Sequence, residues 1–381
     1  MKSNGFISGS RPLKIIHETH MGAALNLARR GLGNVWPNPT VGCVIVKDNK
    51  VIGRGWTQSG GRPHAETEAI RMAGRTGALG STVYVTLEPC NHHGQTPPCT
   101  EALINAGVKR VIIATLDRDK RVAGCGFKRL EKAGISVEVG VSKFEADKIN
   151  RGFFSRIERL KPLVTLKLAT TLDGKIATNN GKSRWITGEY ARKIAHNLRA
   201  IHDAVMIGSG TVIADDPLLT CRLPGLENKN KLRIVVDGRL RIPVDSKLVQ
   251  TAKELPVLIF TRSGSIEKHK KMKKLESFGV EIVVSEDYGM HIDINKVMTE
   301  ISSRGITRLL IEGGGILSAS LLVDDLIDEI AWFRAPSIMG NDGLPAIDGL
   351  DVYKLEQMAM FSRESITNLG DDSLEVLVKK S

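Results

Sequence analysis

Hydrophobic residues in the first 150 positions follow the spacing of short helices and strands in turn. Apolar residues recur at helical intervals from His17 to Gly31, and apolar runs at 41–47 and 51–56 flank a polar turn, which predicts a helix followed by a hairpin. The pattern then predicts a helix at 64–74, a strand at 83–87, a helix at 99–106, a strand at 110–115, a helix at 124–133 and a strand at 135–140. This order is typical of an α/β sheet with helices on both faces.

A second alternation begins after Pro162, which ends a charged stretch that runs from Lys143 to Lys161. Strand-like runs recur, mostly separated by helical or turn-rich segments, at 163–168, 204–208, 233–237, 257–261, 281–285, 308–312 and 329–335. We therefore predict two α/β domains in the 381 residues. The expected divisions are a flexible leader over 1–16, a first domain over 17–150, a linker over 151–162 and a second domain over 163–381.

Composition and charge narrow the class of protein. The chain carries 54 Lys and Arg against 42 Asp and Glu, and residues 1–150 hold 21 of the basic and 12 of the acidic ones. Such an excess attracts anions, and both a phosphorylated metabolite and a nucleic acid would benefit from it. No apolar run approaches the roughly 20 residues that a membrane-spanning helix needs. Five cysteines, an odd number, indicate a reducing compartment, so we expect a cytoplasmic protein.

The candidate chemistry lies in a split pattern of metal ligands. Pro63-His64-Ala65-Glu66 is followed by Leu87-Glu88-Pro89-Cys90 and by Pro97-Pro98-Cys99. One imidazole and two thiolates leave a tetrahedral zinc with an open fourth position for water, as in catalytic rather than structural sites. Glu66 lies two residues beyond the histidine, off its helical face, and is placed to transfer protons rather than to bind the metal. This arrangement is typical of zinc-dependent deaminases of nucleobases and related heterocycles.

The spacing of the cysteines is more specific than the ligand types. Eight residues separate Cys90 from Cys99, where nucleobase deaminases commonly have two. The block from Thr86 to Cys99, with Pro37-Asn38-Pro39-Thr40-Val41-Gly42 upstream, resembles the deaminase half of the bifunctional riboflavin-biosynthesis deaminase/reductase family. The resemblance implies a cytidine-deaminase-like α/β/α domain with substrate contacts at Asn38 and His92. By residue type alone, His92 and His93 could also bind zinc, but the resemblance argues against that role.

Four motifs of the second half resemble the reductase domain of the same family: Thr171–Ala177, Ser183–Thr187, Gly210–Pro217 and Glu312–Gly315. That resemblance implies a dihydrofolate-reductase-like α/β domain that uses NADPH, with Lys167 and Glu312 handling protons. The implied cofactor contacts are Ala169, Trp185, Thr211, Asp215, Gly238, Gly314, Gly315, Ile316, Leu317, Ser318, Ala319 and Ser320. The implied substrate contacts are Ser183, Arg199, Leu219, Arg222 and Glu312. A glycine run after a strand suits a cofactor phosphate, because bare backbone can offer its amides at close range.

Two departures from the family pattern concern phosphate anchoring in the first domain. Gln95 stands where the family usually has a lysine or arginine, and it can hydrogen-bond a phosphate but not neutralise it. Asp117-Arg118-Asp119-Lys120 replaces a proline-containing turn. Arg118, Lys120 and Arg121 are the cations available to restore the lost charge.

The sequence thus predicts a bifunctional enzyme of riboflavin biosynthesis. One Zn²⁺ per chain would serve hydrolytic deamination of 2,5-diamino-6-(5-phosphoribosylamino)pyrimidin-4-one, and NADPH would then reduce the ribosyl chain to ribityl. The expected partners are this phosphorylated pyrimidine and further copies of the chain, as a dimer or tetramer, without nucleic acid or membrane. Two alternatives remain, an RNA-editing or nucleotide-editing deaminase with an appended domain and a non-catalytic zinc-binding module. The cysteine spacing disfavours the first, and the lack of a fourth ligand at suitable spacing disfavours the second.

Overall fold

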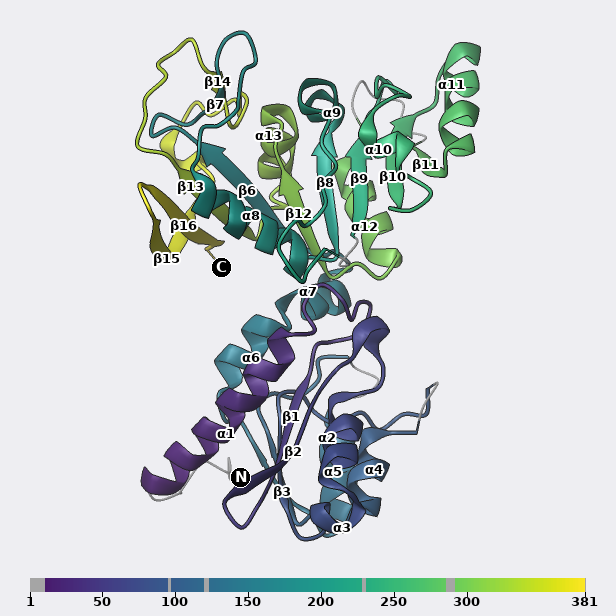
Figure 1. Ribbon diagram of the computed structural model, residues 1–381, viewed down its shortest axis with the longest axis vertical. Coiled ribbons are helices and arrows are strands. Elements are labelled where there is room, and N and C mark those ends of the chain that lie inside the picture. The colour runs from purple at the N-terminus through teal and green to yellow at the C-terminus, as the bar shows by residue number, and fades with distance from the viewer. Residues whose placement is uncertain (1–10, 95–96, 120–122, 228–230, 286–291, 381) are drawn as a thin grey trace. The chain divides into compact units, whose positions relative to one another are not determined.

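The computed structural model describes residues 11–94, 97–119, 123–227, 231–285 and 292–380 (Figure 1). The chain divides into two compact units between Arg159 and Leu160. The predicted linker 151–162 is therefore largely helical, because the helix α7, Arg151–Arg159, occupies most of it and belongs to the first unit. Of the predicted leader, residues 1–10 lie outside the described residues, and residues 11–16 form the start of a helix.

The N-terminal unit is a sheet of five strands in the order β2-β1-β3-β4-β5, counted over the described residues. Its hairpin β1–β2 and the pair β1–β3 are antiparallel, and β3, β4 and β5 run parallel. In chain order, the first elements of the unit are α1 (Arg11–Arg29), β1 (Gly42–Lys47), β2 (Lys50–Trp56), the 3-10 turn η1 (Ser59–Gly61), α2 (Ala65–Ala73) and α3 (Arg75–Ala78). The remaining elements are β3 (Thr82–Val85), α4 (Cys99–Asn105), β4 (Arg110–Ile113), α5 (Cys125–Lys132), β5 (Ser136–Val139), α6 (Lys143–Ile149) and α7.

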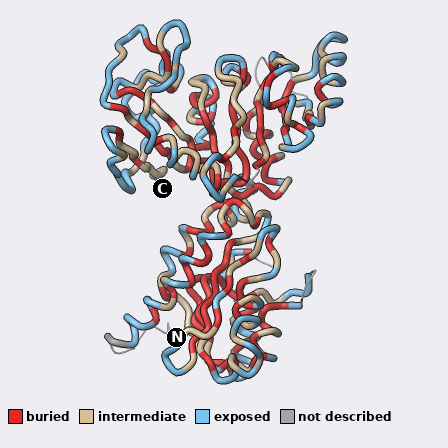
Figure 2. Tube along the Cα trace, in the orientation of Figure 1, coloured by how far each residue is buried: buried red, intermediate tan, exposed pale blue. Residues whose placement is uncertain are grey.

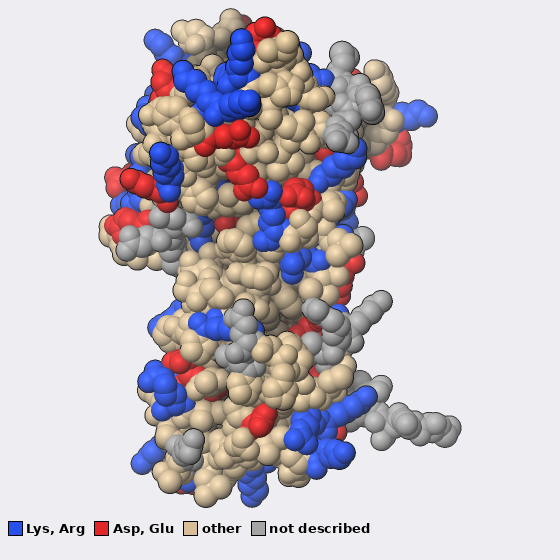
Figure 3. All heavy atoms as spheres, turned by 90° about the vertical axis from the view of Figure 1, so that its right-hand side faces the viewer, with Lys and Arg blue, Asp and Glu red and all other residues tan. Residues whose placement is uncertain are grey.

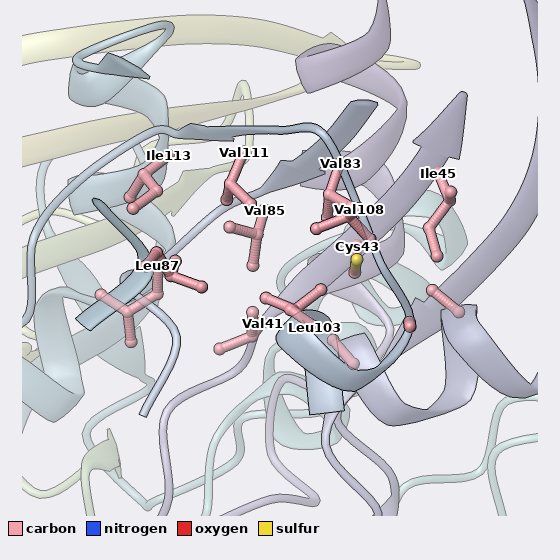
Figure 4. Close-up of a cluster of buried hydrophobic side chains, with 14 of the residues drawn as sticks. Val41, Cys43, Ile45, Val83, Val85, Leu87, Leu103, Val108, Val111 and Ile113 are labelled. Atoms are coloured by element: carbon pink, nitrogen blue, oxygen red, sulfur yellow. The ribbon is translucent and has the colours of Figure 1, made fainter. Parts of the chain in front are cut away.

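Alternating residues of these strands build two apolar layers, because successive side chains point to opposite faces of a sheet. On β1, Cys43 and Ile45 pack with α2, α4, α5 and Phe154 of α7, whereas Val44 and Val46 pack against α1 and α6. Figure 4 shows the first layer, in which Val83 and Val85 of β3 and Val111 and Ile113 of β4 point to the same side of the sheet as Leu103 of α4. The buried strands between exposed helices are visible in Figure 2. The predicted α/β/α arrangement is confirmed.

The C-terminal unit is a mixed sheet of nine strands among the described residues, in the order β11-β10-β9-β8-β12-β6-β13-β16-β15. The strands from β11 to β13 in that order are parallel, and the hairpin β15–β16 joins β13 antiparallel. The parallel strands are β6 (Leu163–Thr170), β8 (Ala204–Gly208), β9 (Leu232–Val236), β10 (Val257–Arg262), β11 (Val280–Ser285), β12 (Arg308–Glu312) and β13 (Glu329–Arg334). Their carboxyl ends lie at one edge, where α/β proteins bind ligands.

Helices pack against the large sheet, and a separate sheet of two strands, β14 and β7, completes the unit among the described residues. The helices are α8 (Glu189–Ile201), α9 (Ser209–Asp215), α10 (Lys247–Gln250), α11 (Ile266–Ser277), α12 (Ile294–Ser303), α13 (Gly315–Val323) and the 3-10 turn η2 (Leu355–Gln357). The other strands are β7 (Lys175–Ala177), β14 (Leu344–Pro345), β15 (Phe361–Leu369) and β16 (Asp372–Lys379). No described helix of either unit has the length and apolar character needed to cross a membrane.

Two differences from the sequence prediction have physical causes. The helix predicted from His17 begins at Arg11. Its early apolar residues Leu13, Ile15 and Ile16 are exposed, so they belong to no packed layer of the core. The strands β7, β14, β15 and β16 were not predicted. Most of β15 is exposed at the edge of the sheet, so polar residues are tolerated there and hide the strand pattern.

Candidate zinc and reductase sites

Two helix starts and one loop bring together the three predicted zinc ligands. His64 directly precedes α2, Cys99 is the first residue of α4, and Cys90 lies in the loop after β3. His64 Nδ1 lies 3.1 Å from Cys99 Sγ and 3.6 Å from Cys90 Sγ, and the three ligand atoms are within 4.8 Å of one another. A tetrahedral zinc with bonds of about 2.0–2.3 Å keeps its ligand atoms roughly 3.3–3.8 Å apart, so this donor set fits the ion.

Burial and a neighbouring thiolate set the proton affinity of Glu66. Its side chain lies on the first turn of α2, and burial, together with the charge of Cys90, raises the pKa of Glu66 to about 6. A hydrogen bond with Cys99 lowers the pKa of Cys90 to about 4, which favours the thiolate form that binds zinc. A carboxyl group with a pKa near neutrality, held beside the ligands, is suited to proton transfer at this centre.

The predicted substrate contacts of the first unit lie on two loops. Asn38 is half-buried, and its side-chain amide fills the space into which a side chain at Gly61 would project. His92 and His93 are exposed on the loop between the two cysteines. His93 Nε2 lies 3.8 Å from a carboxylate oxygen of Glu101, and neither histidine joins the ligand group found among the described residues.

Glu88, which the sequence did not single out for a role, is a buried organiser of the loop behind the zinc ligands. Its carboxylate accepts hydrogen bonds from the backbone N–H groups of Asp117, Gly124 and Phe127 at 3.2, 3.0 and 3.1 Å. The side chain therefore fixes the start of α5 relative to Cys90, two residues further along the chain. The sequence around a glutamate two residues before a predicted ligand does not show whether its carboxylate is buried against backbone amides or exposed.

The guanidinium of Arg118, one of the cations expected to restore the lost charge, is already paired in this structure. Its guanidinium forms ion pairs with Asp147 at 3.1 Å and Glu158 at 3.3 Å, and it lies over the Phe154 ring at 4.2 Å. The expectation that Arg118 replaces the missing phosphate-binding cation is therefore weakened, because its charge is already compensated by α6 and α7. The other residues of that argument, Gln95, Lys120 and Arg121, lie outside the described residues.

In the second unit, strand register places Lys167 beside Glu312. The two residues are partners on the neighbouring parallel strands β6 and β12. The guanidinium of Arg199 donates two hydrogen bonds to the Glu312 carboxylate, at 2.5 and 2.7 Å, and a third to the Thr220 carbonyl at 2.9 Å. Burial opposes ionisation of Glu312, but Arg199 outweighs it and lowers the pKa of Glu312 to about 2. Desolvation lowers the pKa of Lys167.

Arg222 differs from Arg199 in having its guanidinium exposed. It forms no ion pair with any residue that the structure describes. Its backbone N–H donates to Nδ1 of His196 at 3.3 Å, so His196, which the sequence did not point out, helps to hold this loop. Leu219, three residues earlier, is buried and adopts a left-handed conformation with φ of 56°.

The glycine run after β12 forms a backbone cradle at the carboxyl edge of the sheet. Gly313 and Gly314 have φ of 84° and 93°, values that side chains rarely tolerate. A Cβ atom on Gly314 would lie 3.6 Å from Oγ1 of Thr211, so this predicted cofactor contact faces the glycines. Ser318, one turn into α13, has a fully buried hydroxyl without a hydrogen-bond partner among the described residues. The cradle and this unpaired hydroxyl fit a phosphate-bearing cofactor.

Other predicted cofactor and substrate residues gather on the loop after β7. Ser183 donates a hydrogen bond to the Asp215 side chain at 3.4 Å, and Arg184 donates to the Asp215 carbonyl at 3.0 Å. Trp185 is 67% exposed, and the Arg192 guanidinium lies over its ring at 4.5 Å. An exposed, cation-stacked tryptophan is available to pack against a ligand ring.

The remaining predicted contacts divide between the sheet edge and the core. Gly238 follows β9 at the same edge as the glycine cradle, and its carbonyl accepts a hydrogen bond from Lys268 at 3.0 Å. Ala169 lies on β6 and is half-buried. Along α13, the buried members of the run are Leu317, Ser318 and Ala319, and the exposed ones are Ile316 and Ser320. Leu317 and Ala319 thus face the packed side of the helix.

A strap over residues 337–348 runs beside the cradle and was not foreseen. The Asp173 carboxylate accepts backbone hydrogen bonds from Met339 at 3.1 Å and Gly340 at 2.7 Å. Further along the strap, the Asp348 N–H donates to the Gly315 carbonyl at 3.2 Å, and a Cβ on Gly315 would lie 3.1 Å from the Pro345 carbonyl oxygen. The strap therefore borders the N-terminus of α13.

Comparison with protein families gives two matches along the chain. The cytidine and deoxycytidylate deaminase zinc-binding region matches residues 14–115. The RibD C-terminal domain matches residues 162–373. The two matches fall on the two compact units and confirm the predicted pairing of a cytidine-deaminase-like domain with a dihydrofolate-reductase-like domain.

Curated relatives and solved structures cover nearly the whole chain. The riboflavin biosynthesis protein RibD of Aquifex aeolicus is 41% identical over 360 residues, 94% of this chain and 98% of the relative. RibD of Escherichia coli is 39% identical over 368 residues, 93% of this chain and 97% of the relative. Acinetobacter baumannii RibD, form 1, is similar in structure with a TM-score of 0.86 at 36% identity, covering 97% of this chain and 100% of its own.

A further structure, from Thermotoga maritima, is described as a diaminohydroxyphosphoribosylaminopyrimidine deaminase and 5-amino-6-(5-phosphoribosylamino)uracil reductase. It is 34% identical with a TM-score of 0.84, and it covers 97% of this chain and 100% of its own. The chain therefore belongs to the RibD family of bifunctional deaminase/reductases of riboflavin biosynthesis.

Proposed function

We propose that the N-terminal unit removes the 2-amino group of 2,5-diamino-6-(5-phosphoribosylamino)pyrimidin-4-one by hydrolysis, and that the C-terminal unit then reduces the ribosyl chain to ribityl. The observation that carries the first step is the group His64, Cys90 and Cys99 with Glu66 buried beside it. The second step is supported by Lys167 and Glu312 on adjacent strands, next to the glycine cradle.

For the deaminase step, zinc held by His64, Cys90 and Cys99 would supply the Lewis acidity that activates water. Glu66 takes the proton released by that water and returns protons to the ring nitrogen and to the departing ammonia. Its raised pKa of about 6 suits both directions of transfer near neutral pH. Asn38 orients the polar edge of the pyrimidine, and His92 contacts the substrate from the loop between the cysteines.

For the reductase step, NADPH would supply the hydride to the sugar carbon in its imine or open-chain form. Lys167 and Glu312 are the pair proposed to manage the protons. Desolvation lowers the pKa of Lys167, which makes its ammonium group the easier proton donor of the two. Glu312 stays ionised beside Arg199, so its part is to hold a negative charge next to Lys167 rather than to release a proton itself. The exposed guanidinium of Arg222 is the donor suited to the substrate phosphate. Thr211 and the glycine cradle would hold the cofactor phosphates.

Several finer parts of this function rest on family membership. We propose one zinc per chain, a preference for NADPH over NADH, and a homo-oligomer that works in the cytoplasm. With Cys90 and Cys99 assigned to zinc, the other three cysteines form no disulfide, which supports a reducing compartment. Comparable reduction rates with NADH at equal concentration would remove the cofactor preference without affecting the reductase assignment.

An editing deaminase acting on nucleic acid is less well supported. On the face drawn in Figure 3, Lys and Arg side chains lie in separate groups with Asp and Glu among them. On this face of either unit, the positive charge is thus not gathered into one stripe along which a phosphate backbone would bind. The family match also covers the second unit, which an editing deaminase with an unrelated appended domain would not explain.

A coupled assay tests the proposal. Purified protein with zinc is given the diaminopyrimidine substrate and NADPH, and ammonia release and loss of cofactor absorbance are followed together. We expect one ammonia and one oxidised cofactor per substrate, with ammonia appearing first. NADPH oxidation that precedes ammonia release would reverse the assigned order, and a protein that binds no zinc and releases no ammonia would remove the deaminase function.

A further inference from the structure

Asn150 forms a reciprocal pair of hydrogen bonds with the backbone of Thr40. Its Oδ1 accepts from the Thr40 N–H at 3.0 Å, and its Nδ2 donates to the Thr40 carbonyl at 3.0 Å. Asn150 is 2% exposed and lies at the C-terminus of α6, 110 residues after its partner. The buried amide of Asn150 therefore provides both hydrogen-bond partners for the peptide groups of Thr40, which lies in a loop and has no partner strand.

Thr40 ends the loop that carries Asn38, and this loop is held on a second side. The Thr40 hydroxyl donates to the Ala28 carbonyl of α1 at 2.5 Å. On the other side, the amide of Asn38 lies so close to Gly61 that an ideal Cβ there would be 1.8 Å from Asn38 Nδ2. Gly61 stands three residues before His64. A displacement of Thr40 would therefore move Asn38 relative to the zinc ligands.

The segment that contains Asn150 lies between the two family matches, which end at residue 115 and begin at residue 162. It is nevertheless an integral part of the deaminase unit. Phe154 of α7 is 2% exposed and packs in the same apolar layer as the helices that carry the zinc ligands. Arg118 binds Asp147 and Glu158 on α6 and α7 and stacks on this ring. Asn150 thus lies between two helices that are each tied to the rest of the unit by side-chain contacts.

We propose that Asn150 is a positioning residue of the deaminase, which sets Asn38 against the pyrimidine by fixing the backbone of Thr40. The inference rests on the proposed deaminase function and extends it to a segment beyond the deaminase family match. Among the described residues, the hydrogen bonds of the Asn150 side chain go to Thr40 and not to His64, Cys90 or Cys99, so its loss should change substrate orientation and leave the metal in place. A misplacement of about 1 Å in a group that orients substrate commonly costs about 100-fold in rate.

The test is a double-mutant cycle on deamination. Asn150→Ala is expected to lower kcat/KM for ammonia release by about 10- to 100-fold, with zinc content at the parent value. Asn150→Asp keeps an acceptor for the Thr40 N–H and loses the donor to its carbonyl, so its activity should fall between the parent and the alanine variant. In an Asn38→Ala background, Asn150→Ala should add little further loss, because both changes act through one contact.

The controls separate this role from general stability. Asn26→Ala removes an exposed amide of the same unit, whose Oδ1 accepts from Arg29 at 2.6 Å, and should deaminate like the parent. Reduction of the already deaminated compound should be unchanged in every variant. Fully additive losses in the cycle, or an Asn150→Ala variant that deaminates like the parent, would overturn the inference while leaving the proposed function intact. If Asn150→Ala does not fold, the graded activity of Asn150→Asp and its cycle with Asn38→Ala decide the question.

Discussion

The carboxylate of Glu312 receives two parallel hydrogen bonds from the guanidinium of Arg199, at 2.5 and 2.7 Å, in a setting where both side chains are largely buried. A third donor of Arg199 is used by the Thr220 carbonyl. Family resemblance places Arg199 and Arg222 together among substrate contacts, but the structure gives them different surroundings. Arg199 binds Glu312, whereas the side chain of Arg222 is exposed, as the proposed contact with the substrate phosphate requires.

Arg222→Gln and Arg199→Gln should therefore affect reduction in different ways. Arg222→Gln should raise KM for the phosphorylated substrate by about 10-fold or more, with kcat near the parent value, because one charged hydrogen bond is lost. Arg199→Gln should lower kcat and also destabilise the unit by about 3–5 kcal/mol, since Glu312 is left buried without its partner. Steady-state kinetics with phosphorylated and dephosphorylated substrate check this. Equal KM changes for both substrates in Arg222→Gln would exclude a phosphate contact.

Glu66→Gln should abolish most deamination while retaining zinc. The amide keeps the shape of the side chain and cannot take up a proton, so the rate should fall by about 10²–10⁴-fold. Metal analysis and ammonia release are measured on the same sample, and NADPH-dependent reduction of the deaminated compound serves as the internal control. Deamination at the parent rate would show that another group transfers the protons.

His202 should make the C-terminal unit less stable in acid. Its ring is buried between the Leu198 carbonyl and the Thr165 hydroxyl, and burial lowers the pKa of His202 to about 3. The unfolded chain takes up a proton near pH 6.5, whereas the folded chain does so only near pH 3. The contribution of His202 to the free energy of unfolding is therefore fully present above about pH 6.5. It is lost as the pH drops toward 3, by up to about 1.4 kcal/mol per pH unit.

Urea unfolding of the parent and of His202→Gln across this pH range measures the effect. The variant should show a flatter dependence of unfolding free energy on pH, even if it is less stable at neutral pH. His269→Gln is a matched control, because that histidine is exposed on α11 and its Nδ1 contacts a local backbone carbonyl at 2.8 Å. Identical slopes in the parent and His202→Gln would contradict the assignment.

The two units should be separable at residue 159 and not at residue 150. A fragment ending at Arg159 keeps Phe154 in the core, whereas a fragment ending at Asn150 loses it and the ion pair between Arg118 and Glu158. Removing a buried phenylalanine typically costs about 3–5 kcal/mol. We expect residues 1–159 to fold, bind zinc and deaminate without NADPH, and residues 160–381 to reduce only the deaminated compound.

Circular dichroism, zinc content and ammonia release on fragments 1–159 and 1–150 check the boundary, with full-length Phe154→Ala as a comparison. A fragment 1–150 as stable as 1–159 would return the segment to the status of a linker. A folded, zinc-loaded fragment 1–159 that deaminates only after addition of residues 160–381 would instead require coupling between the units.

Local patterns in the sequence determined much of this protein. The alternation of apolar runs predicted the strands β1 to β6 and β8 to β13. Central strands such as β8 and β10 are buried and therefore carry nearly continuous hydrophobic residues, whereas the edge strands β2, β5 and β11 mix apolar with polar residues. The spacing of His64, Cys90 and Cys99 predicted a set of metal ligands, and the structure brings their ligand atoms within 4.8 Å of one another. Ligand type and spacing suffice there, since the chemistry of zinc restricts its donors to few residues.

The tertiary structure decided how individual polar residues are used. Three arginines with the same expected chemistry have different surroundings in the structure. Arg118 packs on Phe154, Arg199 binds Glu312, and Arg222 is exposed. Likewise, the sequence of α7 looks like a charged linker, because its buried face is short. Its apolar residues contact a core that is assembled from distant strands, and this contact is not visible in the sequence. The pairing of Asn150 with Thr40 spans 110 residues. Such partners leave no periodic trace in the sequence, because a hydrogen bond between distant residues depends on where the packed elements place them and not on the spacing of their neighbours.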